Sequence, residues 1–174
     1  RKIFEFEEKM PHTCYILSKD IKRDALKHGG QEEKIRFVKP EEELDVNGCR
    51  IQTLRSTDEG VAFLIRYQGV SLYHAGDLNA WYWEEEGDDY VNMMRRNYER
   101  EIQKIDGETI DAAFVPVDPR LEGQYAEGLD FFMRHTRTKC VFPMHFWNDY
   151  GIFERLKKEA CTAKYRERIM EIRE

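Results

Sequence analysis

The chain of 174 residues has the length of one domain and is long enough to enclose a hydrophobic core. Hydrophobic residues make up 41% of it, as in globular proteins, and the net charge of -6 argues against a nucleic-acid backbone as a partner. No apolar run is long enough to span a bilayer, and no signal peptide is visible. We therefore expect residues 1–174 to form one domain that binds neither nucleic acid nor membrane.

Four cysteines are scattered along the chain without a C-x-x-C pair, at Cys14, Cys49, Cys140 and Cys161. This spacing argues against a structural zinc site. Cys14 and Cys140 fall in apolar stretches, where a reduced, buried thiol packs as a small hydrophobic group. We therefore expect a reduced, cytoplasmic protein.

Short apolar stretches dominate the first half of the chain. They predict strands at residues 13–17, 35–38, 44–46, 50–54, 61–67 and 70–73. Asn47-Gly48 and Gln68-Gly69 join two pairs of these stretches, which predicts two hairpins. We expect these strands to form one sheet, with helices over residues 1–9 and 20–30.

The second half alternates between helix-forming and strand-forming segments. Helices are predicted over 88–105, 122–135 and 150–161, with strands at 112–117 and 140–142. Such alternation is typical of a sheet edge that is partly parallel and covered by helices. The sequence therefore predicts an α/β fold.

The stretch from Val70 to Asn79 is where the chain is most informative about function. A short apolar strand runs into a tight turn that presents His74, Asp77 and Asn79. In layered α/β folds, functional side chains gather at such strand ends. A carboxylate here and an imidazole at a neighbouring strand end are suitable ligands for Zn²⁺, Mn²⁺ or Fe²⁺.

Two motifs in this order resemble those of a known family. His74-Ala-Gly-Asp77 resembles the fourth motif of the metallo-β-lactamase-fold hydrolases, and Val141-Phe-Pro-Met-His-Phe146 resembles their last motif. The details, including Ser56-Thr-Asp-Glu-Gly60 and Pro143-Met-His-Phe-Trp147, are closer to the ascorbate-phosphate-lactonase-like or uncharacterised bacterial branches than to lactamases. The resemblance covers residues 15–147 and implies an αββα sandwich.

The resemblance also implies a catalytic centre. Asp77 would bridge two divalent metal ions and His145 would bind the second, with zinc as the first choice and manganese or iron as alternatives. Metal-bound hydroxide would hydrolyse a small ester, lactone, amide or phosphodiester. The acidic surface favours a small anionic or neutral metabolite as substrate. The structural alternative is that Asp77 caps a turn and that His145 is a core histidine.

The sequence departs from the family pattern in two places. The first motif, His-x-His-x-Asp-His, has no counterpart among the five histidines, and Ser56 stands where the third motif has a histidine. The chain begins at Arg1, in what would be the helix after the first motif. We therefore expect an N-terminally incomplete domain, with a first metal site that is weak, empty or completed by Asp58 or water.

Several other residues are candidates for supporting roles. Candidate metal ligands or residues that orient the ligands are Ser56, Asp58 and His74. An ordinary turn explains the first two equally well, and core packing explains the third. Candidate walls of a substrate pocket are Asn79, Trp81, Trp83, Arg120 and Trp147. The alternatives here are aromatic packing and, for Arg120, a surface ion pair.

Two functions follow from these expectations. The first is a metal-dependent hydrolase, provided that the full-length protein supplies the missing ligands. The second is a catalytically dead or truncated member, without bound metal, that works by binding or assembly. Because half a sandwich exposes apolar sheet surface, we also expect a homo-oligomer or association with the missing N-terminal segment.

Overall fold

The computed structural model describes residues 3–5 and 9–172, and its strands fall into two sheets. The smaller sheet pairs β1 (Tyr15–Ser18) with β2 (Ile35–Val38). The larger sheet has the order β3-β4-β5-β6-β7-β8. Its strands are β3 (Glu43–Val46), β4 (Cys49–Arg55), β5 (Val61–Tyr67), β6 (Val70–His74), β7 (Thr109–Pro116) and β8 (Arg137–Met144).

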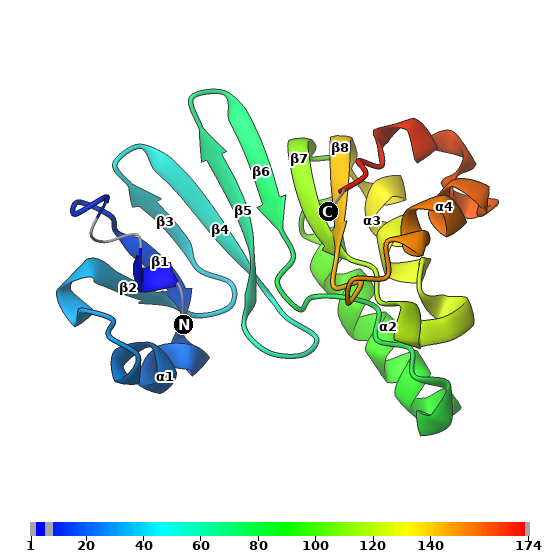
Figure 1. Cartoon of the computed structure of the whole chain (residues 1–174), viewed down its shortest axis with the longest axis horizontal. Coiled ribbons are helices and arrows are strands. Elements are labelled where there is room, and N and C mark those ends of the chain that lie inside the picture. The colour runs from blue at the N-terminus through cyan, green and yellow to red at the C-terminus, as the bar shows by residue number, and fades with distance from the viewer. Residues whose placement is uncertain (1–2, 6–8, 173–174) are drawn as a thin grey trace.

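The helices are distributed unevenly around these sheets. They are α1 (Lys22–Lys27), α2 (Asp88–Gln103), α3 (Glu127–His135) and α4 (Gly151–Lys158). Figure 1 shows α2, α3 and α4 gathered at the β7–β8 end of the large sheet, and α1 with the small sheet at the β3 end. No helix in the described ranges is long and apolar enough to cross a membrane.

The expectation of a single sheet from the first-half strands is wrong. β1 and β2 pair in parallel, and the chain crosses from one to the other through α1. A parallel pair needs such a crossover, whereas the strands from β3 to β6 are joined by short turns and pair antiparallel. The local strand patterns therefore do not show which strands pair, and β1 and β2 form a sheet of their own.

Both predicted hairpins are confirmed. Asn47 and Gly48 have φ angles of 54° and 81°, and Gln68 and Gly69 have φ angles of 47° and 82°. Two successive left-handed residues are the requirement of a type I′ turn, whose twist matches that of the flanking strands.

The predicted parallel edge is also confirmed. β6, β7 and β8 run parallel to one another, with α2 and α3 in the two crossovers. Because the strands are parallel, their carboxyl ends lie at one edge of the sheet.

One face of the large sheet is covered by helices. A cross-strand row on this face joins Leu64, Tyr73, Ala113 and Val141, and none of them is more than 1% exposed. The Tyr73 ring stacks on Phe132 of α3 at 4.8 Å between centroids. This row forms the centre of the core.

The opposite face, here called the open face, is apolar but only partly covered. Its side chains include Phe63, Ile65, Leu72, Phe114 and Phe142 from neighbouring strands. Leu72 is 39% exposed, and the other four are half-buried. The rings of Phe114 and Phe142 stack on each other at 5.2 Å.

Other expectations need correction. The predicted N-terminal helix is a short 3-10 turn at residues 3–5, and residues 6–8 lie outside the described ranges. The helix predicted over 20–30 is reduced to α1, which has only 6 residues. Cys14 precedes β1 and is exposed, so it is not the buried strand residue that its apolar neighbours suggested.

Gly128 provides a test of how tightly the helices pack on the sheet. A Cβ added at Gly128 in the first turn of α3 would lie 2.1 Å from Asn79 Oδ1, whereas one added at Gly123 meets nothing within 4 Å. We expect Gly128→Ala to lower the free energy of unfolding by about 1–3 kcal/mol, because overpacking forces neighbours to shift. Urea denaturation of both variants measures this, and an equal effect of Gly123→Ala would refute the packing explanation.

Candidate functional site

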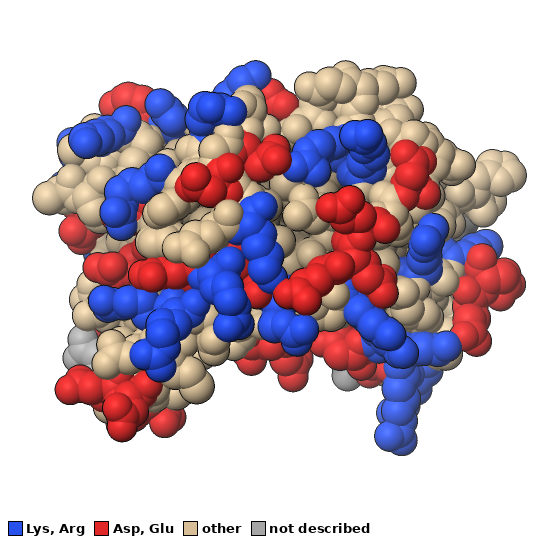
Figure 2. Space-filling model, turned by 180° about the vertical axis from the view of Figure 1, so that it is seen from behind, with Lys and Arg blue, Asp and Glu red and all other residues tan. Residues whose placement is uncertain are grey.

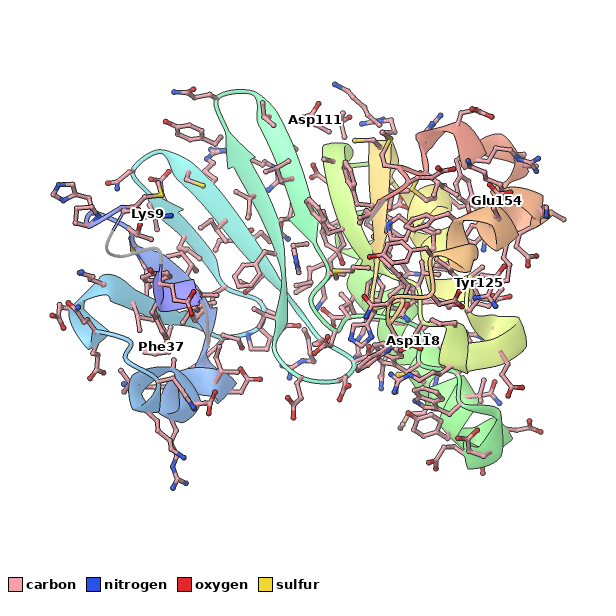
Figure 3. All side chains as sticks on the ribbon, in the orientation of Figure 1. Lys9, Phe37, Asp111, Asp118, Tyr125 and Glu154 are labelled. Carbon is pink, nitrogen blue, oxygen red and sulfur yellow. The ribbon has the colours of Figure 1, made fainter. Side chains whose placement is uncertain are left out.

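Three polar side chains meet at the carboxyl edge of the parallel strands. Asp77, Asp118 and His145 follow the ends of β6, β7 and β8, respectively. Figure 3 shows Asp118 at one end of β7 and Asp111 at the other. The parallel strand order thus brings together residues that are far apart in the sequence.

His145 lies between the two carboxylates. Its Nε2 is 3.4 Å from Asp77 Oδ1, and its Nδ1 is 3.2 Å from Asp118 Oδ2. The first distance exceeds the usual length of a hydrogen bond, whereas the second is within it. If Nδ1 donates its proton to Asp118, Nε2 faces Asp77 as the second nitrogen of the ring, and a cation could be held between Nε2 and the Asp77 carboxylate.

Asp118 is fully buried and is surrounded by donors. It accepts hydrogen bonds from the backbone, Nε and Nη2 of Arg120, from Nε1 of Trp147 and from His145. Burial alone would raise the pKa of Asp118, but these donors outweigh it and lower the pKa to about 2. The side chain is therefore a permanent anion at neutral pH.

The loop after β8 adopts an unusual backbone conformation. His145, Trp147 and Asn148 have φ angles of 68°, 51° and 63°. Non-glycine residues in this left-handed region cost of the order of 1–3 kcal/mol each and cluster at functional sites. Here the strain directs the His145 and Trp147 side chains back to Asp118, where both are hydrogen-bonded.

Trp81 is buried beneath the Asp77 turn and is not an exposed pocket wall. It is only 4% exposed. Its Nε1 donates to the backbone oxygen of Asp77 at 2.8 Å, and its ring contacts the edge of His145 at 5.3 Å between centroids. Trp81 thus connects the two candidate metal ligands.

Asn79 is also buried rather than part of a pocket wall. The hydroxyl of Thr57 donates to its backbone oxygen and accepts from its backbone N–H. Its side-chain amide is buried against Gly128 and has no hydrogen-bond partner among the described residues. Thr57 and Asn79 therefore tie the Asp77 turn to the loop after β4.

Ser56 and Asp58 lie in a turn, and His74 ends β6. The hydroxyl of Ser56 accepts from the backbone of Asp58, and Asp58 is exposed. His74 accepts from the backbone N–H of Gly76 and stacks on Phe114, so it stabilises the turn without a hydrogen bond to Asp77. The contacts of Ser56 and Asp58 correspond to an ordinary turn, whereas His74 is exposed and is therefore not packed in the core.

Three pocket candidates do cluster at the surface. The guanidinium carbon of Arg120 lies 4.6 Å from the Trp147 ring centroid and 5.5 Å from that of Trp83. Trp147 is 63% exposed, an unusual value for an indole. Arg120 and Trp83 also line a small cavity of about 130 Å³.

The pair formed by Asp77 and His145 has a spacing that suits a metal ion. Two ligand atoms about 2.1 Å from a tetrahedral metal lie about 3.4 Å apart, and the observed separation is 3.4 Å. Asp118 behind His145 is the carboxylate partner that metal-binding histidines commonly have. In the described part of the chain, no group of three or more His, Cys, Asp or Glu side chains is arranged to hold a metal ion.

Asp118 is the site residue that sequence reasoning missed. The sequence predicts a role only for its neighbour Arg120, as a candidate wall of the substrate pocket. The available signal was position, since Asp118 follows a predicted strand whose end lies at the same edge as Asp77 and His145.

Solved structures with a similar fold exist at low sequence identity. A metal-dependent hydrolase from Parabacteroides distasonis, provisionally so described, is 14% identical with a TM-score of 0.57, over 91% of this chain and 64% of that one. The diiron β-hydroxylase CmlA from Streptomyces venezuelae is 10% identical with a TM-score of 0.51, over 76% of this chain and 30% of that one. The metallo-β-lactamase fold protein YhfI from Bacillus subtilis is 11% identical with a TM-score of 0.43, over 82% and 57%. No family model and no curated protein matches the sequence.

These comparisons confirm the expected α/β fold, which the chain shares with the metal-dependent hydrolase and with CmlA. At such low identity they establish the fold alone, and membership of the metallo-β-lactamase superfamily and of a branch within it remains a prediction. The chain spans 64% of the hydrolase and 30% of CmlA, so the activities of those proteins do not transfer directly.

The low pKa of Asp118 makes a prediction about stability. Because this pKa is about 2 in the folded chain against an ordinary value of 3.8, the carboxylate stabilises the fold above about pH 4, and this contribution is lost as the pH falls through 2. We expect Asp118→Asn to lower the free energy of unfolding by about 2 kcal/mol at pH 7 and by progressively less towards pH 2. Urea denaturation across pH measures this. Asp149→Asn, which alters an exposed ion pair, is the control, and a pH-independent loss in Asp118→Asn would contradict the prediction.

Proposed function

We propose that the chain carries half of the metal centre of a hydrolase, with Asp77 and His145 as its ligands. The observation that supports this is the 3.4 Å separation of Asp77 Oδ1 and His145 Nε2, with Asp118 hydrogen-bonded to the other nitrogen of the imidazole. A buried, anionic Asp118 keeps the proton on Nδ1 and leaves Nε2 free as a ligand.

The remaining roles follow from the contacts of these residues. Trp81 fixes the Asp77 backbone and packs on the His145 ring, which limits the movement of both ligands. A bound divalent metal, zinc by preference, would lower the pKa of a water molecule and polarise a carbonyl or phosphoryl oxygen. The substrate would be a small ester, lactone, amide or phosphodiester. Figure 2 shows acidic and basic side chains intermingled on one face, which does not resemble the basic patch of a nucleic-acid binder.

Two protein ligands are fewer than the three or more that catalytic zinc sites use. We infer that the others come from protein segments outside the described residues. The open face offers a surface for such a segment or for a second copy of the chain, since it leaves Leu72 and its neighbours partly exposed.

A metal-free binding protein is the second candidate. The observation that favours it is the same shortage of ligands, because Ser56 and Asp58 form a turn and do not reach towards Asp77 by any hydrogen bond among the described residues. This candidate shares the fold and the open face but predicts no metal binding.

Zinc binding separates the two candidates. We expect the purified chain to bind zinc measurably by isothermal titration calorimetry, with affinity falling at least about tenfold in Asp77→Ala, because a charged ligand is removed. Asp58→Ala should bind like the wild type. Equal zinc binding by Asp77→Ala would show that Asp77 is not a ligand. If zinc binds as expected, hydrolysis of p-nitrophenyl acetate and bis-p-nitrophenyl phosphate by the zinc-loaded chain tests activity.

The open face can be tested separately by sedimentation velocity. We expect the chain to self-associate with rising concentration and Leu72→Glu to shift it towards monomer, because a carboxylate would be buried in an apolar contact. Met93→Glu, at an exposed apolar position on α2, is the matched control. A wild-type chain that stays monomeric throughout would argue against a homo-oligomer.

A further inference from the structure

We propose that Arg120, clamped between Trp83 and Trp147, binds an oxyanion of the substrate, so that the substrate is an anionic compound. This rests on the proposed hydrolase function, because it assigns a substrate class to the same site. Arg120 and His145 both hydrogen-bond to Asp118, so only the Asp118 carboxylate separates the guanidinium from the candidate metal ligand.

The hydrogen bonds of Arg120 leave one edge of its guanidinium free. Asp118 accepts from Nε and Nη2, which occupies one side of the planar group. Nη1 donates to no acceptor among the described residues, and the side chain is 53% exposed. The two Nη1 hydrogens and the second Nη2 hydrogen thus remain available. One hydrogen from each nitrogen makes the end-on fork that fits a carboxylate or phosphate.

The aromatic contacts hold this fork in place before any ligand binds. Trp147 lies over the guanidinium at 4.6 Å and Trp83 at 5.5 Å. Trp147 is itself fixed by its hydrogen bond to Asp118. A donor group that is already ordered loses less conformational entropy on binding, and the exposed Trp147 ring offers a flat surface for the rest of the ligand.

The surrounding charges determine which experiment is decisive. Asp118 already balances the charge of Arg120, and Glu85 and Glu122 line the same cavity as Arg120. These glutamates would favour a cationic ligand, so an ammonium compound is the direct competitor to the proposed oxyanion. The cavity of about 130 Å³ suits a single small group rather than a whole substrate.

Trp83 and Trp147, two of the three tryptophans of the chain, lie over Arg120, so their indole N–H signals report on this site. We would titrate the ¹⁵N-labelled chain, treated with EDTA, with benzoate, benzamide and benzylamine, which share a ring and differ in charge. We expect benzoate to shift indole signals saturably, with affinity at least about fivefold above benzamide and benzylamine. Tighter binding of benzylamine, or no preference for benzoate, would overturn the proposal.

Arg120→Lys keeps a cation beside Asp118 but removes the planar fork. We expect it to weaken benzoate binding about tenfold while the three indole signals remain dispersed, which shows that the fold is intact. Arg95→Lys is the matched control, since Arg95 also lies over an aromatic ring, that of Tyr82. Unchanged benzoate binding in Arg120→Lys would refute the assignment. Because no metal is present, this result is independent of whether Asp77 and His145 bind zinc.

Discussion

The site depends on the burial of one charge, the carboxylate of Asp118. An unpaired carboxylate out of contact with water costs many kilocalories per mole, so donors must surround it. Arg120, Trp147 and His145 meet this need, and each is thereby fixed in position. One electrostatic requirement thus orients a candidate metal ligand, a candidate substrate contact and an exposed indole.

The fold provides the frame that makes this arrangement possible. Three parallel strands end at one edge, and each is followed by a residue of the site. Parallel pairing requires crossover segments, and these contain α2 and α3. The two helices cover one face of the strands, with Tyr73 and Phe132 at the centre of the contact. A buried, helix-covered sheet is rigid, which suits a site whose interatomic distances must be held to within a few tenths of an ångström.

Most of the fold could be predicted from local patterns, because strand alternation and the Asn47-Gly48 turn are determined by neighbouring residues. The separation of β1 and β2 from the large sheet was missed, since pairing depends on the path of the connection rather than on the strands themselves. At the site, strand-end position and family resemblance identified Asp77 and His145 as a pair. The burial of Asn79 and Trp81 could not be inferred, because the sequence of a loop is the same whether its aromatic and amide side chains face solvent or the core. Asn79, for example, is buried against Gly128.

The two edge strands of the large sheet, β3 and β8, are protected in different ways against pairing with a further strand. β3 carries Glu43 and Asp45, and charges on an outer strand oppose the addition of another strand. β8 is covered in part by the C-terminal segment, where Ile169 forms a bridge with Val141 and Met170 donates to the Val141 oxygen. Sideways growth of the sheet by strand addition is therefore hindered at both margins. Assembly through the large sheet would therefore use its open face, and two copies that pair through the same face form a closed dimer.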